Sequence, residues 1–288
     1  MTNNRFRVRP GHTVDLRHYD PGDTRPFKNK RKSIDKLEKG LERLIELQTQ
    51  LYAQDRWAVL LIFQGMDASG KDSAITHVMS GLNPQGTQVY SFKRPSDEEL
   101  DHDFLWRTTR ALPERGRIGI FNRSYYEEVV VVRVHPEILA RQKLPASLVT
   151  SRIWKDRYED INAFERYLTR NGTLIRKFFL HVSKAEQKRR LLERLDDPSK
   201  NWKFEPGDLD ERNRWDDYMH EYEQALSRTS TKHAPWFIVP ADHKWFARLT
   251  IAELVVDALQ SLDLKFPKPS EAHVAALAEA RKRLEGEP

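Results

Sequence analysis

Residues 57–72, WAVLLIFQGMDASGKD, combine a short apolar run with a glycine-containing loop. The run 57–63 is continuous rather than alternating, which is typical of a parallel strand covered on both faces. The loop fits the spacing G-x-x-x-x-G-K from Gly65 to Lys71, and a helical pattern follows it. A P-loop needs this order, because backbone N–H groups and the helix N-terminus must face the phosphates. We therefore predict that residues 65–72 cradle a phosphate.

The residue types within this loop fit phosphate binding, with one departure. Gly65 and Gly70 allow the backbone to turn without Cβ clashes, and Lys71 supplies a point charge for phosphoryl oxygens. Asp72 stands where most P-loops have a Ser or Thr for Mg²⁺, and Asp67 lies inside the loop. Two carboxylates repel a phosphate unless a cation lies between them. Asp72 either caps the helix, or Asp67, alone or with Asp72, binds Mg²⁺ or orients the acceptor phosphate.

The rest of the chain alternates strand and helix patterns. Further strands are expected at 87–92, 117–121, 173–182 and 236–240. Helices are expected from Ser33, over 96–110, over 146–169, from Lys184, over 208–229, over 242–262 and in the tail. Two of them open with capping boxes, at Ser96–Glu99 and Ser183–Glu186. The segment 125–134 is ambiguous, because its valines favour a strand by propensity.

This alternation predicts an α/β fold with a five-stranded parallel sheet. We divide the chain into a basic arm and helix (1–54), a P-loop kinase domain (55–265) and a tail helix (266–288). The arm holds nine Lys and Arg against three Asp in residues 1–32. It is either a solvated arm or one that meets a polyanion or a neighbouring subunit.

Composition excludes several other classes of protein. The chain has 288 residues, a net charge of +6 and no cysteine, so disulfides and thiolate metal sites are excluded. No apolar run is long enough to span a membrane, and the N-terminus lacks the apolar core of a secretory signal. A cytoplasmic location is therefore expected.

A second polar cluster follows the strand 117–121, at the sheet edge where open α/β folds bind ligands. Asn122 ends this strand in place of the usual Asp, and Arg123 follows it. Arg123 is either a phosphate contact or a surface ion-pair partner. Glu127 and Glu128 are either a solvated helix face or counter-charges to the cations of the site.

A third cluster is the basic helix from Lys184, which carries Arg190 and Arg194 four residues apart on one face, with Lys203 beyond it. A basic helix is often only a solvated face. After the fourth strand of a P-loop fold, however, the segment 184–215 is expected to be a helical lid whose arginines close over phosphates.

The motifs together resemble the polyphosphate kinase 2 family. The matching stretches, in order along residues 57–245, are FQGMDASGKD (63–72), SFKRPSDEEL (91–100), HDFLWR (102–107), IGIFNRSYYEEV (118–129) and KRRLLERLDDPSKNWKF (188–204). The resemblance implies a P-loop kinase-like three-layer fold with a helical lid over a basic channel. It also implies that 125–134 is helical. The implied activity is reversible, Mg²⁺-dependent transfer of a terminal phosphoryl between inorganic polyphosphate and a nucleotide, with Mn²⁺ as a second candidate ion.

The resemblance implies roles for Asp67, Lys71, Lys93, Asn122, Arg123, Arg190 and Arg194, and the residue patterns above add the other expected site residues. Catalytic roles fall on Asp67, Lys71 and Arg123, and metal binding falls on Asp67 and Asp72. Asn122, Glu127 and Glu128 are expected at the acceptor nucleotide, and the sequence around Asn122 resembles the subgroup that accepts both mono- and diphosphates. The expected phosphate and polyphosphate contacts are Gly65, Ala68, Ser69, Gly70, Lys93, Arg190, Arg194 and Lys203. A homodimer or homotetramer is implied as well.

Physical chemistry agrees with such a substrate, because a flexible polyanion is bound by a track of Lys and Arg rather than by side chains that read bases. Nucleoside mono-, di- and triphosphates would be the other substrates. The first alternative is a nucleotide kinase that uses ATP as donor, which would need a shorter basic track. The second is a nucleic-acid-binding protein with a degenerate P-loop, but no nucleic-acid motif is present and no membrane partner is expected.

Overall fold

The computed structural model describes residues 3–27 and 29–287, and its centre is the expected parallel sheet. Five strands lie in the order β2-β3-β1-β4-β5, and every neighbouring pair is parallel. The strands are β1 (Ala58–Gln64), β2 (Thr87–Ser91), β3 (Ile118–Asn122), β4 (Thr173–His181) and β5 (Trp236–Pro240). All seven residues of β1 are buried, which explains the continuous apolar run of its sequence.

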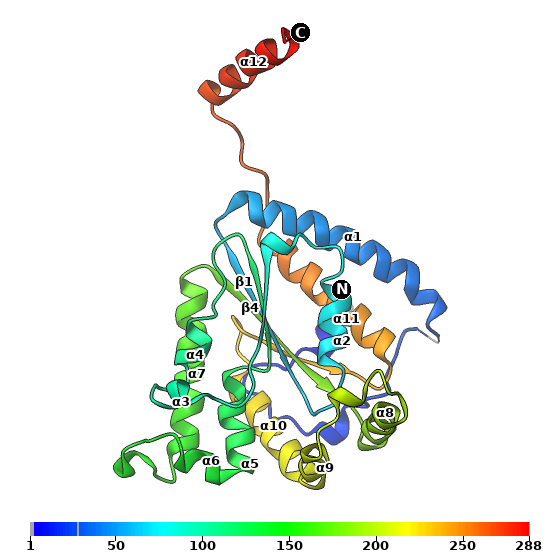
Figure 1. Cartoon of the computed structure of the whole chain (residues 1–288), viewed down its shortest axis with the longest axis vertical. Coiled ribbons are helices and arrows are strands. Elements are labelled where there is room, and N and C mark those ends of the chain that lie inside the picture. The colour runs from blue at the N-terminus through cyan, green and yellow to red at the C-terminus, as the bar shows by residue number, and fades with distance from the viewer. Residues whose placement is uncertain (1–2, 28, 288) are drawn as a thin grey trace.

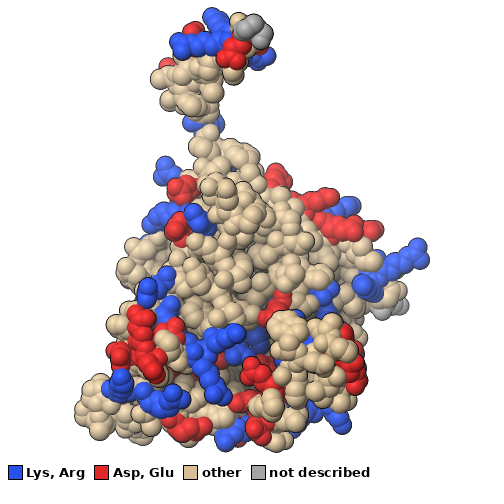
Figure 2. Space-filling view, in the orientation of Figure 1, with Lys and Arg blue, Asp and Glu red and all other residues tan. Residues whose placement is uncertain are grey.

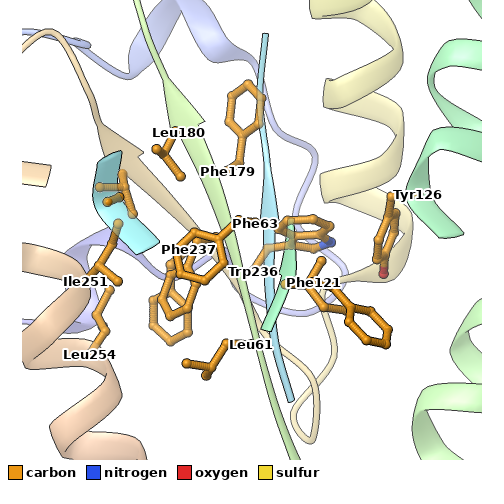
Figure 3. Close-up of a cluster of buried hydrophobic side chains, with 14 of the residues drawn as sticks. Leu61, Phe63, Phe121, Tyr126, Phe179, Leu180, Trp236, Phe237, Ile251 and Leu254 are labelled. Atoms are coloured by element: carbon orange, nitrogen blue, oxygen red, sulfur yellow. The ribbon is translucent and has the colours of Figure 1, made fainter. Parts of the chain in front are cut away.

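The register of the sheet brings the predicted functional segments to one edge. Phe63 of β1 lies opposite Asn122 of β3 and opposite Phe178 of β4. Because the strands are parallel, the P-loop after β1 and the segment from Asn122 onward leave the sheet side by side. Figure 3 shows the core that supports this edge, with Phe63, Phe121 and Trp236 among its labelled side chains.

Helices cover both faces of the sheet, which confirms the three-layer architecture (Figure 1). One face carries α1 (Arg31–Gln54), α2 (Lys71–Val78) and α11 (Lys244–Gln260). The other face carries α5 (Val131–Val134), α7 (Ile153–Arg170) and α10 (Trp215–Thr229). At the carboxyl edge lie α8 (Lys184–Asp196), η6 (Asn201–Lys203) and α9 (Gly207–Asn213), which occupy the predicted lid segment.

Three expected helices are shorter or more broken than the sequence pattern suggested. The segment 96–110 forms two short helices, α3 (Asp97–Leu100) and α4 (Trp106–Thr109), because the Asp103 carboxylate accepts the N–H of Leu105 in a local turn. The capping box at its start is present. The segment 146–169 is helical only from Ile153, after a short turn η5 (Ala146–Leu148). The segment 208–229 is divided between α9 and α10 at Arg214.

The other sequence signals are borne out with small changes. The ambiguous segment 125–134 is helical, as η4 (Tyr125–Val129) and α5, and α6 (Pro136–Ala140) follows. A short turn η3 (Pro84–Gly86) precedes β2. Only half of the second capping box forms: the Ser183 hydroxyl accepts the Glu186 N–H, but the Ser183 N–H donates to Asp242 instead. Among the described residues, no helix has the length and apolar character that crossing a bilayer requires.

The N-terminal arm packs against the domain. It contains the turns η1 (Asn3–Phe6) and η2 (Leu16–His18), and four of its apolar side chains are buried: Phe6, Val8, Val14 and Leu16. The Val8 N–H donates to the Trp236 carbonyl, beside an antiparallel bridge from Arg7 to Phe237. The arm therefore contributes to the core at the β5 edge, beyond what its charge alone suggested. Residues 1, 2 and 28 of the arm and residue 288 of the tail lie outside the described residues.

The tail helix α12 (Glu271–Glu285) forms as expected. Figure 1 shows it standing away from the body on the segment 266–270. Every residue of α12 is exposed.

Candidate active site

The loop between β1 and α2 has the conformation that its glycines were expected to allow. Gly65 has φ +146°, and a Cβ added there would lie 2.8 Å from the Leu180 carbonyl oxygen and 2.9 Å from Ser69 Oγ. Gly70, with φ +103°, is the N-cap of α2. Both positions are strained for any L side chain, so the backbone can fold closely around a small anion only with glycine.

Lys71 is buried at the start of α2, and its ammonium group is fixed by the loop itself. Nζ donates to the carbonyl oxygens of Gly65 and Met66 at 2.8 and 3.2 Å. Burial lowers the pKa of Lys71, and the charge of Asp67 opposes that shift. An ammonium group has three donors, so one remains for a phosphoryl oxygen.

Asp67 and Arg123 bridge the ends of the two central strands. Arg123 Nη2 donates to Asp67 Oδ1 at 2.8 Å, and the Arg123 backbone, at φ +64°, donates its N–H to the Phe63 carbonyl. Burial alone would raise the pKa of Asp67. The positive charges of Lys71 and Arg123 outweigh that effect and hold the pKa of Asp67 below its ordinary value. Burial also opposes the charge of Arg123, yet Glu127 and Asp67 raise its pKa. Both groups therefore stay ionised at neutral pH.

Further charged groups surround this pair. Burial raises the pKa of Glu127, against the lowering effects of Arg123 and Lys71. Arg194 of α8 adds to the cations that lower the pKa of Asp67, and its Nη1 lies 3.5 Å from Asp208 Oδ2. The structure thus brings together five predicted site residues from the P-loop, the β3 end and the lid: Asp67, Lys71, Arg123, Glu127 and Arg194.

Asn122 and Asp72 form a separate pair at the mouth of the loop. Asn122 Nδ2 donates to Asp72 Oδ1 at 2.5 Å. Asp72 is exposed in the first turn of α2, while the N-cap is Gly70 and no side chain caps the helix. The helix-capping role considered for Asp72 is therefore wrong, although a carboxylate in the first turn still favours the helix dipole.

Arg190 occupies a different place from the predicted phosphate contact. Its side chain is 3% exposed, and all five of its N–H donors are used by the protein. Nη1 donates to the carbonyls of Ala68 and Ser69, Nη2 donates to those of Ala241 and Asp242, and Nε donates to Glu186. The phosphate role of Arg190 is thus corrected: it ties the P-loop backbone to α8 and to the segment after β5.

Replacing Arg190 with Met is expected to lower the free energy of unfolding by about 3 kcal/mol, because several buried carbonyls lose their donor. The neighbouring Arg189 is the matched control, since it is 55% exposed and its ion pairs with Glu186 and Glu193 lie at the surface. Arg189→Met should cost less than about 1 kcal/mol. Urea denaturation measures both, and equal losses would contradict the assignment.

Three other predicted residues lie at the flanks or in the interior. Lys93 and Lys203 are exposed, and the Lys203 ammonium lies 5.0 Å from the centre of the Trp202 ring. Glu128 is buried against Arg107 and Arg157, so its predicted place at the acceptor nucleotide is also corrected. Figure 2 shows Lys and Arg side chains gathered over the lower half of the body, with Asp and Glu among them.

Sequence reasoning missed two residues that support the site. Gln187 Nε2 of α8 donates to the Asp67 carbonyl at 3.0 Å and thereby fixes the loop from the lid side. Tyr222 of α10 is buried, and burial raises its pKa, with the negative charges of Glu127 and Asp67 adding to that shift. Neither residue belongs to a motif, and only their helical faces could have suggested them.

The carboxylates of the site fit a magnesium ion that substrate phosphates help to bind. Among residues 3–27 and 29–287, no group of three or more His, Cys, Asp and Glu could hold a metal. Mg²⁺ commonly takes one or two carboxylates together with phosphates and water. Asp67 is ionised and has one oxygen engaged by Arg123, so its donor chemistry suits that mode.

The P-loop follows the central strand of a parallel three-layer fold. Cations lie at the end of the neighbouring strand and on a lid helix. This arrangement defines a P-loop kinase-like protein. The model of the family described as polyphosphate kinase 2 matches residues 28–267. The chain belongs to the polyphosphate kinase 2 family.

Individual relatives are similar over nearly the whole chain. An ADP-polyphosphate phosphotransferase of Rhodopseudomonas palustris is 52% identical, over 97% of each chain. An AMP/ADP-polyphosphate phosphotransferase of Meiothermus ruber is 43% identical, over 93% of this chain and 97% of that one. The crystal structure of polyphosphate kinase 2 from Arthrobacter aurescens has a TM-score of 0.86 at 42% identity, covering 96% of this chain and 95% of that one.

Proposed function

We propose that this protein transfers a terminal phosphoryl group between inorganic polyphosphate and nucleoside mono- or diphosphates. The reactions would be AMP to ADP and ADP to ATP, or their guanine equivalents, in either direction. The observation that carries the proposal is similarity over 97% of both chains to a relative named ADP-polyphosphate phosphotransferase. The AMP/ADP-polyphosphate phosphotransferase of Meiothermus ruber supports the use of both kinds of acceptor.

The geometry fits catalysis by alignment and charge neutralisation. A terminal oxygen of the acceptor phosphate attacks the terminal phosphorus of polyphosphate, and the phosphoanhydride bond to the next phosphate breaks. The shortened polyphosphate leaves with the electron pair of that bond. Lys71, Arg123 and Arg194 would neutralise the oxygens of the transferred group. The acceptor oxygen is already ionised near neutral pH, so the step needs no strong general base.

Asp67 is the residue that would hold Mg²⁺, with Asp72 as a second candidate. When bound, the ion would supply positive charge that offsets the repulsion between the loop carboxylate and the phosphates. Asp67 also keeps Arg123 oriented through the 2.8 Å hydrogen bond, so its carboxylate serves the site in two ways. Mn²⁺ has similar oxygen-ligand chemistry and is expected to substitute.

We propose a homodimer or homotetramer in the cytoplasm. The absence of cysteine suits a reducing compartment. Light scattering on the purified protein gives the oligomeric state directly.

Donor choice distinguishes the proposal from an ATP-dependent nucleotide kinase. With Mg²⁺ and AMP, polyphosphate should give ADP and then ATP, whereas ATP as donor should react more slowly. Chromatography of the nucleotides measures both rates. A faster reaction with ATP, or no ADP from polyphosphate, would favour the alternative.

A further inference from the structure

A buried polar network lies behind the β2 and β3 ends, outside the reaction centre. Its central group is Glu128, whose side chain is 5% exposed. Oε1 lies 3.6 Å from Arg107 Nη2, and Oε2 lies 3.7 Å from Arg157 Nη1. Gln142 donates to Oε2 at 2.5 Å and accepts from Arg157 Nη2 at 2.5 Å. The preceding residue, Glu127, belongs to the candidate site, so the two adjacent glutamates have different partners.

Arg107 carries this network to the loop that follows β2. Its side chain is 8% exposed, and Nη1 donates to the Lys93 carbonyl at 2.8 Å. Its guanidinium lies 5.6 Å from the centre of the Phe92 ring. The Phe92 N–H in turn donates to the Asn122 carbonyl at 3.1 Å. The backbone at residues 92–93 is therefore fixed from two sides, by the β3 end and by Arg107.

The loop held in this way presents two cations. The side chains of Lys93 and Arg94 are exposed, and neither has an ion-pair or hydrogen-bond partner among the residues that the structure describes. The strand order β2-β3-β1 places them on the far side of β3 from the P-loop. Donor and acceptor oxygens lie roughly in line across the transferred phosphorus. The lid begins with α8, which directly follows β4, so the lid lies on the β4 side of the sheet. The β2 side is therefore left for the acceptor.

We infer that Arg107 and Glu128 are positioning residues that hold Lys93 and Arg94 against the phosphate of the acceptor nucleotide. This inference rests on the proposed function. Neither residue touches the substrate: Glu128 orients Arg107, and Arg107 fixes the carbonyl from which Lys93 projects. Arginine suits this task because its planar fork can face Glu128, Glu99 and the carbonyl at once, which a lysine cannot do.

Steady-state kinetics of Arg107→Met and Glu128→Gln test the inference. Both should raise the KM for ADP about tenfold and change kcat less than threefold, because the loop becomes loose while the P-loop is intact. Arg107→Lys should recover part of the loss. Arg110→Met is the matched control: its side chain is 65% exposed beside Glu98, and it should leave both constants unchanged. A fall in kcat at constant KM would overturn the inference.

A double-mutant cycle separates this role from general stability. In a Lys93→Ala/Arg94→Ala background, Arg107→Met should change the KM for ADP less than twofold, because the cations that it positions are gone. Fully additive effects would overturn the inference.

Calorimetric binding of ADP without polyphosphate gives the same comparison when no turnover occurs. If the wild type binds ADP but does not use polyphosphate, the proposed function fails and the cycle can still be scored. Should Arg107→Met fail to fold, Glu128→Gln and Arg107→Lys carry the test, since both retain the volume of the side chain.

Discussion

Lys71→Met should lower kcat about 10³-fold while the protein stays folded, because it removes a preorganised charge at the transferred phosphoryl group. Two carbonyls of the P-loop already hold the Lys71 ammonium, so its charge needs no rearrangement before the reaction. Methionine keeps an apolar stem and removes the charge together with the two hydrogen bonds that Nζ donates to the loop. Initial rates with saturating polyphosphate and ADP measure the effect.

Two controls accompany the Lys71→Met measurement. Lys265→Met changes an exposed lysine at the end of the domain, whose ammonium group pairs with Asp263, and should leave kcat unchanged. Far-ultraviolet circular dichroism and urea denaturation show whether Lys71→Met is folded. A folded variant with a rate within tenfold of the wild type would remove Lys71 from the mechanism.

Lys177→Met should cost about 4 kcal/mol of unfolding free energy, because it leaves a buried carboxylate without its cation. Lys177 and Glu165 are both fully buried, with Nζ to Oε2 at 2.6 Å. Nζ also donates to the Tyr126 hydroxyl and to the Thr229 carbonyl, both at 2.8 Å. Burial lowers the pKa of Lys177 to about 8, and Glu165 opposes that shift, so the amine stays protonated at pH 7.

Two further variants show whether burial accounts for the cost of breaking the Lys177–Glu165 pair. Lys155→Met removes an exposed pair with Glu159 at 3.8 Å and should cost less than about 1 kcal/mol. Lys177→Met/Glu165→Met should cost less than the sum of its single changes, since it leaves no isolated charge. Urea denaturation measures all of them, and a Lys177→Met cost no greater than that of Lys155→Met would contradict this account.

The buried Lys177–Glu165 pair also supports the candidate site. Glu165 accepts hydrogen bonds from the hydroxyls of Tyr125 and Tyr126 at 2.9 and 2.8 Å. These tyrosines begin η4, which carries Glu127 and directly follows Arg123 and Ser124. The core network therefore fixes the segment that carries Arg123 and Glu127 of the candidate site.

The fold was predictable because its signals are local. The apolar run before Gly65 and the spacing to Lys71 define a strand, a turn and a helix without reference to the rest of the chain. The helix expected over 96–110 failed at Asp103, where a side chain competes with the helix for a backbone N–H. Propensity sums over a window do not detect such a single competing hydrogen bond.

The site was predictable in its motifs and less so in the direction of its side chains. Asp67, Lys71 and Arg123 follow directly from loop and strand ends, and the structure brings them together. Arg190 and Arg194 have the same charge and lie four residues apart on one helix, yet Arg194 adds to the cations that lower the pKa of Asp67, whereas the Arg190 guanidinium is bonded to protein carbonyls. The partners of Arg190 are carbonyls 51 and 122 residues away in the chain, so tertiary packing decides where its guanidinium lies.

Phosphorus NMR tests most directly whether polyphosphate is the phosphoryl donor at this P-loop. With Mg²⁺, polyphosphate and ADP, the wild type should convert one polyphosphate phosphate into one ATP γ-phosphate, and Lys71→Met should show no conversion over the same time. ATP formed without matching loss of polyphosphate, or no ATP from the folded wild type, would contradict the account.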